Sequence, residues 1–435
     1  MLAQLTIPPL KSDVFLTLAE IRQRWQEIVR DHPATFRHEV IGESADGRDI
    51  DLITAGSGSK SSLLVGVPHP NEPIGALTVL QLLRALAETP EWLSDNDRTV
   101  AFIPVADPDG LSLNEGWFKQ PQSPLTYALN FYRPPSSEQV EWSFPIDYKD
   151  LHFNTPAPET SAVMAAIDKL HPDDLFSLHN SAFGGAYFYT SNREPAFHDA
   201  LRAAVAQTSV PLHRGEPEAP YVEVFSPAVH RILSATGHYD FMVDQGADIS
   251  QMGGGGSWDY LQARCPGAQI LVCEVPYFTA PALSDESASG LTRRQAGLQG
   301  LAERRKVMSK LADAFQQVQA DAPHDRLWRA VRWYVDYMTS TIDAEASDLA
   351  SEQYAQPATG SQAFDAVACR TFYNLLFVGI ARRVALGVGN HGLADELERV
   401  IATTLDDVCH AGEMRPLPLA DLVGVQVAAW MAMVG

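Results

Sequence analysis

The N-terminal part of the chain alternates short apolar strands with helices, and this alternation limits the fold more than any other feature. Buried strands are indicated at 61–67, 99–110, 175–180 and 269–278, and a helix at 73–88 separates the first two. Parallel strands require crossover connections of this kind. The sequence therefore predicts an α/β fold built on a largely parallel sheet.

The first elements are expected to be a helix and a strand pair. Ser12 and Asp13 are candidate caps for a helix that continues to His32 and Pro33, where a proline stops it. The following segment reads as two strands around a turn near Asp46 and Gly47.

The character of the chain changes after about residue 321. Residues 1–320 are predicted to form the catalytic domain, and residues 322–435 a mostly helical C-terminal domain or extension, broken near 355–362. A length of 435 residues is ample for one large domain and a smaller one.

Charge and composition exclude several classes of protein. With 32 basic and 54 acidic residues the net charge is -22, which repels nucleic-acid backbones, so no nucleic-acid partner is expected. No uninterrupted apolar run reaches the ~18 residues that span a bilayer, and no signal peptide is evident. The 4 cysteines form no Cys-x-x-Cys pair. We therefore expect a cytoplasmic protein with no membrane partner.

A His-x-x-Glu motif lies where a buried strand passes into a helix. His69 follows the strand 61–67, and Glu72 precedes the helix that begins at Pro73. Ligands bind at the strand ends of open α/β sheets, which favours this pair as metal ligands. The same spacing recurs at His213/Glu216 and at His410/Glu413. Those two pairs lie in a proline-rich loop and at a helix end, where solvated surface residues are the simpler interpretation.

Two further strands carry candidate residues for the same site. His179 ends the strand 175–180, and a lone histidine there is either structural or the third ligand that a His/Glu/His zinc site requires. Glu274 lies inside the apolar strand 269–278, where a carboxylate is costly unless it is paired or functional. It is either an ion-paired core residue or a general base.

Taken together, these motifs resemble the zinc carboxypeptidases of the carboxypeptidase A-like (funnelin) group. The resemblance covers roughly residues 12–310. It rests on IGESADGRDI (41–50), HPNEP (69–73), DPDG (107–110), the strand ending at His179, GGGGSWDY (253–260) and the strand carrying Glu274. It implies a mixed, mostly parallel eight-stranded sheet sandwiched by helices. It also implies one zinc ion held by His69, Glu72 and His179, with Glu274 as general base.

In that family an arginine between the N-P-D-G turn and the third ligand stabilises the oxyanion. Arg133 is the only arginine between Gly110 and His179, so it is the candidate for this role. An arginine on a surface loop is the alternative.

The chain departs from the family where the peptidases carry D-L-N-R-N-F-P. Here the stretch 150–156 reads DLHFNTP, so His152 and Phe153 replace the Asn-Arg pair that grips the substrate carboxylate, and Asn154 follows them. Phenylalanine cannot make a bidentate contact with a carboxylate. The carboxylate requirement of a carboxypeptidase is therefore not predicted for this chain.

Other candidate substrate-binding residues come from the segment 231–260. Gln251 stands near the position of the family's flap tyrosine, for which Tyr239 is a possible substitute. Trp258 stands where a pocket residue is common, and Arg231 is a candidate replacement anchor for an anion. A core tryptophan and a surface arginine are the simpler interpretations of the last two.

Three functions remain open from the sequence. The first is a zinc amide hydrolase that acts on a peptide or peptide-like substrate. The second is a deacylase or amidase on a small N-acyl amino-acid-like compound, as in the aspartoacylase-like branch. The third is a non-catalytic scaffold whose helical part binds a partner, but all the catalytic residue types are present, which argues against it.

The helical C-terminal part has aromatic residues at helical spacing, at Trp328, Trp333, Tyr334 and Tyr337. Packing within the protein is the simplest interpretation. A homo-oligomer interface or a lid over the site are the alternatives.

Overall fold

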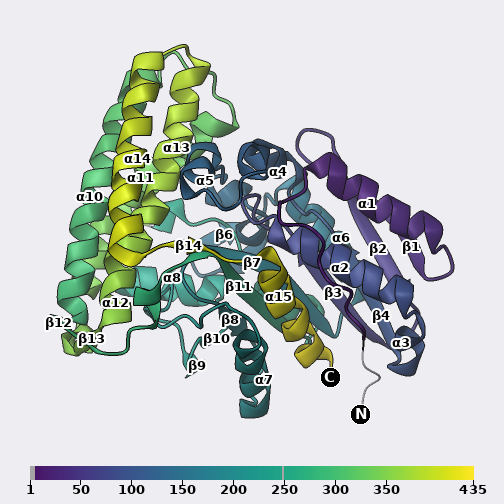
Figure 1. Cartoon of the computed structure of the whole chain (residues 1–435). Helices are drawn as coiled ribbons and strands as arrows, with labels where there is room; N and C mark the ends of the chain where they lie inside the picture. The colour runs from purple at the N-terminus through teal and green to yellow at the C-terminus, as the bar shows by residue number, and fades with distance from the viewer. Residues whose placement is uncertain (1–4, 247–248) are drawn as a thin grey trace.

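A mixed sheet with helices on both faces forms the centre of the protein, and further helices follow it in the chain (Figure 1). The computed structural model describes residues 5–246 and 249–435. The strands are β1 (Phe36–Glu43), β2 (Asp49–Gly56), β3 (Lys60–Gly66), β4 (Arg98–Ile103), β5 (Ile146–Tyr148), β6 (Leu151–Phe153), β7 (Asp174–Phe183), β8 (Tyr187–Thr190), β9 (Val224–Ser226), β10 (Val229–Arg231), β11 (Gln269–Thr279), β12 (Ala288–Thr292), β13 (Pro357–Thr359) and β14 (Arg415–Pro416).

The helices are α1 (Leu18–Asp31), α2 (Ile74–Glu88), α3 (Glu91–Asp95), α4 (Pro108–Asn114), α5 (Pro124–Asn130), α6 (Pro158–Leu170), α7 (Pro195–Ala206), α8 (Ala235–Asp244), α9 (Ser257–Arg264), α10 (Arg293–Val318), α11 (Arg326–Asp348), α12 (Gly360–Phe364), α13 (Arg370–Gly387), α14 (His391–Gly412) and α15 (Leu419–Val434).

The large sheet has the strand order β1-β2-β4-β3-β7-β11-β8-β10-β9, with β14 paired to β11. Its central strands β4, β3, β7 and β11 run parallel, as the β-α-β alternation predicts. The expected number of strands was wrong, because the sheet has 10 strands and not eight. Short strands account for the difference, since β9 spans 3 residues and β14 spans 2.

Both faces of the central strands are buried, which explains their near-continuous apolar sequences. Along β3, Leu64 packs into the core beneath α2, whereas Leu63 and Val65 pack into the core beneath α6. Alternate residues of a strand point to opposite faces, so one apolar run supplies two cores.

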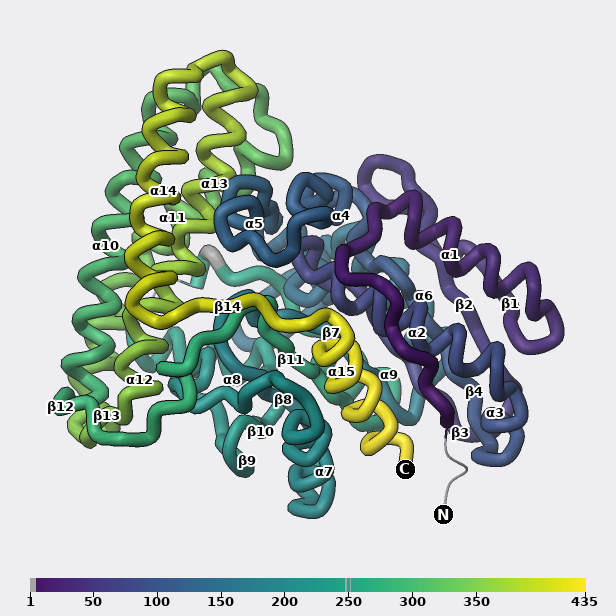
Figure 2. Tube along the Cα trace, in the orientation of Figure 1, coloured from purple at the N-terminus to yellow at the C-terminus, as the bar shows by residue number. Residues whose placement is uncertain are grey.

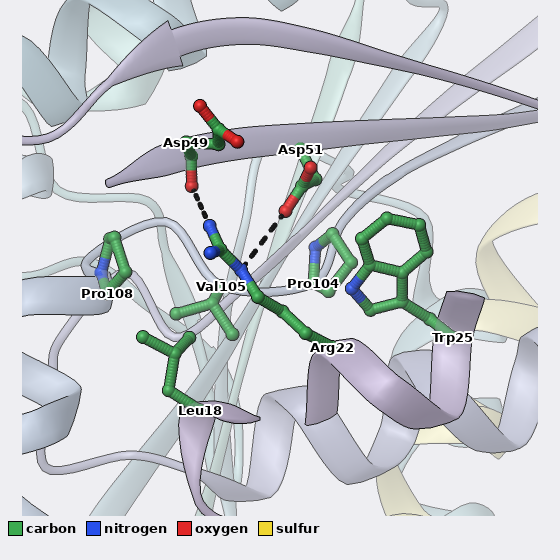
Figure 3. A pocket seen from close by; sticks show the side chains of 8 residues that line it. All are labelled: Leu18, Arg22, Trp25, Asp49, Asp51, Pro104, Val105 and Pro108. Carbon is green, nitrogen blue, oxygen red and sulfur yellow. Dashed lines mark hydrogen bonds and ion pairs between the residues drawn. The ribbon is translucent and has the colours of Figure 1, made fainter. Parts of the chain in front are cut away.

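Helix α1 begins later than predicted, at Leu18 and not near Ser12. Thr17 and Glu20 form a capping box there, which satisfies backbone N–H groups at the helix start. The helix docks on β2 through Arg22, whose guanidinium donates to the Asp49 carbonyl and pairs with Asp51 across a small hollow (Figure 3).

Helices α10, α11, α13 and α14 pack together beside the sheet, and α5 packs against α13 (Figure 1). The aromatic residues of α11 pack inside the protein. Trp328 contacts Phe315 of α10, and Tyr334 stacks on Phe377 of α13 with ring centroids 3.7 Å apart. Trp328 and Tyr334 therefore pack within the protein, as the simplest interpretation predicts.

The chain then returns to the sheet. After α14 it pairs with β11 as β14 and ends in α15, which packs against α2, α7 and β11 (Figure 2). The last helix of the helical part thus covers the sheet that the N-terminal part builds.

One helical stretch, Gly360–Gly387, is long and apolar enough to cross a membrane by length and composition alone. It contains no uninterrupted apolar run of about 18 residues, because polar and charged side chains interrupt it. In the structure 67% of its most apolar window is buried inside the protein, as is typical of a core helix.

Candidate active site

His69 and Glu72 lie in the turn between β3 and α2. The Glu72 amide donates to the His69 carbonyl at 3.1 Å, which closes the turn and directs both side chains to one side. Helix α2 approaches the strand closely at Gly75, where an added Cβ would lie 3.0 Å from the Cβ of Leu178. A larger residue at this position would push the helix, and Glu72 with it, away from the sheet.

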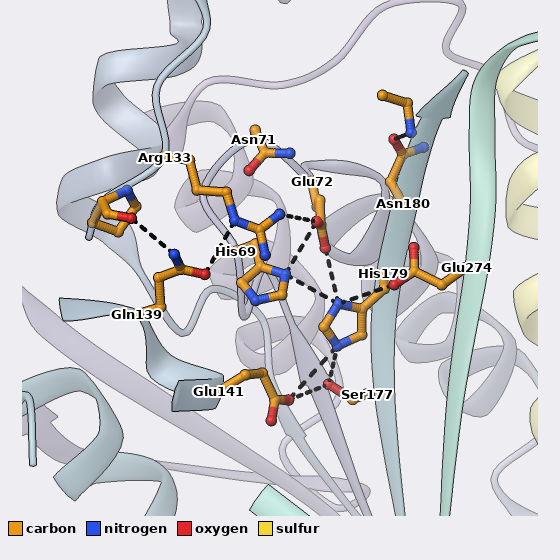
Figure 4. Close-up of polar contacts among 12 residues, drawn as sticks. His69, Asn71, Glu72, Arg133, Gln139, Glu141, Ser177, His179, Asn180 and Glu274 are labelled. Carbon is orange, nitrogen blue, oxygen red and sulfur yellow. Dashed lines mark hydrogen bonds and ion pairs between the residues drawn. The ribbon is translucent and has the colours of Figure 1, made fainter. Parts of the chain in front are cut away.

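The three predicted ligands converge from the turn after β3 and from the middle of β7 (Figure 4). The expectation that His179 ends its strand was wrong, because β7 continues to Phe183. The Nδ1 atom of His69 lies 3.1 Å from the Glu72 carboxylate and 3.2 Å from the Nδ1 atom of His179. His179 Nδ1 is in turn 3.1 Å from the other Glu72 oxygen. All three side chains are buried.

This arrangement fits a zinc ion. Two imidazole Nδ1 atoms and a carboxylate are the donor types that zinc prefers. Three ligands about 2.1 Å from a tetrahedral zinc ion would lie about 3.4 Å from one another, close to the observed separations. Burial lowers the pKa of His69 to about 4, so this imidazole is neutral. For His179 burial acts in the same direction, but Glu72, Glu141 and Glu274 outweigh it and raise the pKa well above its ordinary value. A zinc ion would have to displace the proton that these carboxylates stabilise on His179.

His179 is oriented from behind by a serine and a carboxylate. Its Nε2 atom lies 2.8 Å from Ser177 Oγ, which donates to Glu141 at 2.8 Å. Glu141 is also 3.6 Å from that Nε2 atom and accepts the Ser257 amide. Burial opposes ionisation of Glu141, but its contacts with His179 outweigh burial and lower its pKa to about 2. A carboxylate behind a ligand histidine is typical of zinc sites.

Glu274 lies beside His179 because β7 and β11 run parallel with these two residues in register. Its Oε1 atom is 3.7 Å from His179 Nδ1, and among the described residues its buried Oε2 atom has no hydrogen-bond partner. Burial raises its pKa well above the ordinary value, and the charges of Glu72 and Glu218 raise it further. An unpartnered buried carboxylate next to a metal site can accept a proton.

Arg133 reaches the same centre from the loop after α5. Its Nη1 atom lies 3.3 Å from Glu72 and 3.3 Å from the Tyr373 hydroxyl, and its Nε donates to Gln139 at 3.1 Å. The structure therefore brings together five predicted residues: His69, Glu72, Arg133, His179 and Glu274.

The predicted substrate-binding residues whose side chains are described make other contacts. His152 is exposed on β6 and pairs with Asp147, Asn154 is exposed, and Phe153 packs against Gly254. Trp258 packs against the core beneath α6. The side chain of Gln251 lies outside the described residues.

Arg231 and Tyr239 are engaged in other contacts. Arg231 is exposed and pairs with Glu223 at 3.5 Å, on the opposite face of β10 from His230. That Arg231 anchors a substrate anion stays a prediction. Tyr239 was the possible substitute for the flap tyrosine. Its hydroxyl donates a hydrogen bond to Asp150 at 3.2 Å, beneath the β5–β6 hairpin.

Three residues at the site were missed from the sequence: Glu141, Tyr373 and Gln426. Gln426 is fully buried on α15, where its Nε2 donates to the His179 carbonyl at 3.0 Å and its Oε1 accepts from Thr78. The sequence signal for Gln426 was a side-chain amide inside a mostly apolar helix. Nothing in the local sequence marks Glu141 or Tyr373.

A family model described as zinc carboxypeptidase matches residues 21–277. The chain belongs to the zinc carboxypeptidase family. It is therefore a zinc metallopeptidase, and the matched segment contains all five residues gathered at the site. None of the curated protein sequences matches this chain.

Several solved structures are similar to this one. Carboxypeptidase A from Helicoverpa armigera has 14% identity over 61% of this chain and 65% of its own, with a TM-score of 0.41. A metallo-carboxypeptidase from Burkholderia cenocepacia has 17% identity over 60% of each chain and a TM-score of 0.37. Bovine thrombin-activatable fibrinolysis inhibitor has 13% identity over 60% of this chain and 86% of its own, with a TM-score of 0.39.

Proposed function

We propose that this metallopeptidase hydrolyses an amide bond in a peptide or peptide-like substrate, with one zinc ion held by His69, Glu72 and His179 and with Glu274 as general base. The observation that carries the proposal is the convergence of three buried ligand atoms beside the unpartnered Oε2 atom of Glu274. When bound, zinc would polarise the scissile carbonyl and activate water.

The protein groups divide the remaining work. Glu274 takes a proton from the attacking water and passes it to the leaving amine, for which its raised pKa suits it. The Arg133 guanidinium, turned toward the centre by Gln139 and Tyr373, stabilises negative charge that develops on the carbonyl oxygen.

The substrate is not required to carry a free C-terminal carboxylate. The supporting observation is that neither residue at the positions of the family's Asn-Arg pair supplies a cation at the centre: His152 is exposed and Phe153 packs on Gly254. We therefore expect amide-blocked peptides to be cleaved.

The test measures zinc content and hydrolysis together. Elemental analysis of wild type should give about one zinc per chain, and Glu72→Gln should bind zinc at least about tenfold more weakly, because an amide is a poorer ligand than a carboxylate. Glu413→Gln is the matched control, since Glu413 follows His410 with the same spacing on the surface.

The substrate panel contains dipeptides with free carboxylates, their C-terminal amides and N-acyl amino acids. Cleavage of the amides supports the proposal. Exclusive cleavage of N-acyl amino acids would favour the deacylase instead. A wild-type protein that binds no zinc would overturn the proposal.

A further inference from the structure

A second polar group adjoins Glu274 on the same face of the sheet. It consists of Tyr187, Tyr189, Glu218 and His230, called here the tyrosine–glutamate cluster. Its strands continue the sheet next to the metal-site strands, in the order β7-β11-β8-β10.

The strand register places the cluster next to Glu274. Tyr187 is paired with Glu274 across β8 and β11, and His230 is paired with Tyr189 across β10 and β8. Residues paired in register share a face, and neighbouring strands lie about 4.8 Å apart. The row His179, Glu274, Tyr187 therefore crosses three adjacent strands on the face that holds the metal site.

Glu218 is a carboxylate without a cation. Its two oxygens accept hydrogen bonds from the Tyr187 and Tyr189 hydroxyls, the second at 3.3 Å. No arginine, lysine or histidine within residues 5–246 and 249–435 forms an ion pair with it. The neighbouring Glu216 and Glu223 differ in this respect, because Arg293 pairs with the first and Arg193 with the second.

The cluster has a buried floor and an exposed rim. Tyr187 and Tyr189 are 5% and 3% exposed, whereas Glu218 is exposed to solvent. Burial and the Glu218 charge raise the pKa of both tyrosines well above the ordinary value, so both remain hydrogen-bond donors. The Glu218 carboxylate is thus held in place by two fixed phenols while its charge stays uncompensated.

His230 adds unused hydrogen-bonding capacity. It is 4% exposed, and among the described residues neither ring nitrogen has a hydrogen-bond partner. Burial and nearby His213 lower its pKa to about 4, so the ring is neutral and offers one acceptor nitrogen. An unpartnered buried polar group of this kind is costly unless something binds it.

We propose that the tyrosine–glutamate cluster recognises a cationic group, an ammonium or a guanidinium, on the substrate of the metal site. The inference rests on the proposed function. An uncompensated carboxylate held by two phenols and a neutral imidazole acceptor both favour a cation over a neutral or anionic group. The net charge of -22 favours the approach of such substrates.

The first test compares two variants of equal charge change. Glu218→Gln keeps an acceptor for the tyrosines but removes the charge, and Glu223→Gln makes the same change in an ion pair just before β9. Each is assayed on blocked dipeptides that differ only in lysine or norleucine beside the scissile bond.

Wild type should prefer the lysine substrate by about tenfold in kcat/KM, the usual effect of a hydrogen bond to a charged group. In Glu218→Gln the kcat/KM of the lysine substrate should fall to that of the norleucine substrate, whose own kcat/KM should not change. Glu223→Gln should keep the wild-type preference. Equal loss on both substrates would show a structural role and overturn the inference.

A second measurement needs no turnover. Calorimetric titration of the wild-type protein with lysine amide and norleucine amide should show tighter binding of lysine amide, abolished in Glu218→Gln and retained in Glu223→Gln. Equal binding of the two amides by a protein that cleaves the norleucine peptide would overturn this inference and leave the proposed function intact. Selective binding of lysine amide without any hydrolysis would support the inference and overturn the proposed function.

Discussion

The strand-end site and the helices that follow it contribute to the same centre in different ways. His179 and Glu274, which lie in the middle of their strands just beyond the end of β3, meet because β7 and β11 are parallel and in register. Tyr373 and Gln426 come from α13 and α15 and reach the site only through the packing of those helices. The first group supplies the reactive atoms, and the second supports groups that lie next to them.

This difference shows that the helical part is built into the enzyme. Gln426 joins α15 to the backbone of the β7 ligand, and Arg326 at the start of α11 donates to Asp109 in the DPDG turn at 2.7 Å. The helices therefore hold the sheet from two sides at the level of the site.

The largest expected effect belongs to the strand-end group. Glu274→Gln should lower kcat by about 10³-fold because the general base is lost, while zinc content stays at the wild-type level. Steady-state kinetics and elemental analysis of the same preparation measure both. Activity within tenfold of wild type would mean that another group accepts the proton.

A smaller effect is expected from the helical part. Tyr373→Phe removes the hydroxyl that contacts Arg133 and should lower kcat by about tenfold, with KM and zinc content little changed. Tyr337→Phe is the matched control, since Tyr337 stacks on Trp333 in the neighbouring α11. Equal activity of the two variants would mean that the helices only cover the site.

The last effect is on stability and not on rate, and it concerns the turn that Arg326 holds. Burial raises the pKa of Asp107, the residue that caps α4, to about 7. The folded protein therefore binds this proton more tightly than the unfolded chain does, and the associated stability is lost as pH rises from about 4 to about 7.

Asp107→Asn keeps the hydrogen-bond acceptor for Gly110 but removes the titration. The variant should gain about 3 kcal/mol in unfolding free energy relative to wild type between pH 4 and pH 7. Urea unfolding at both pH values measures this gain. A constant difference between variant and wild type across this range would contradict the assignment.

Much of the site was predictable because it depends on local sequence and on strand ends. Apolar runs that end in His69 and His179 predict two parallel strands whose ends meet, and a glutamate inside the run 269–278 points to the same place. Arg133 was placed correctly at the centre by its position in the family pattern.

Other residues could not be predicted because their contacts span long separations in sequence. Glu141 lies in an irregular loop and Gln426 contacts a residue 247 positions away. The start of α1 was misplaced because two capping signals compete, and only the capping box at Thr17 is compatible with burial of Phe15. The contacts of Arg231 could not be predicted, because a strand of three residues is too short to show which of its side chains share a face.

The sequence by itself determined the strand alternation, the His-x-x-Glu turn, the third histidine and the buried glutamate, because each depends on residue periodicity and on short-range geometry. Only the tertiary structure decided which face of β10 meets the site, how α13 and α15 dock, and that Glu218 lacks a cation. These depend on packing and electrostatics between segments that are far apart in the chain, where neither periodicity nor spacing carries information.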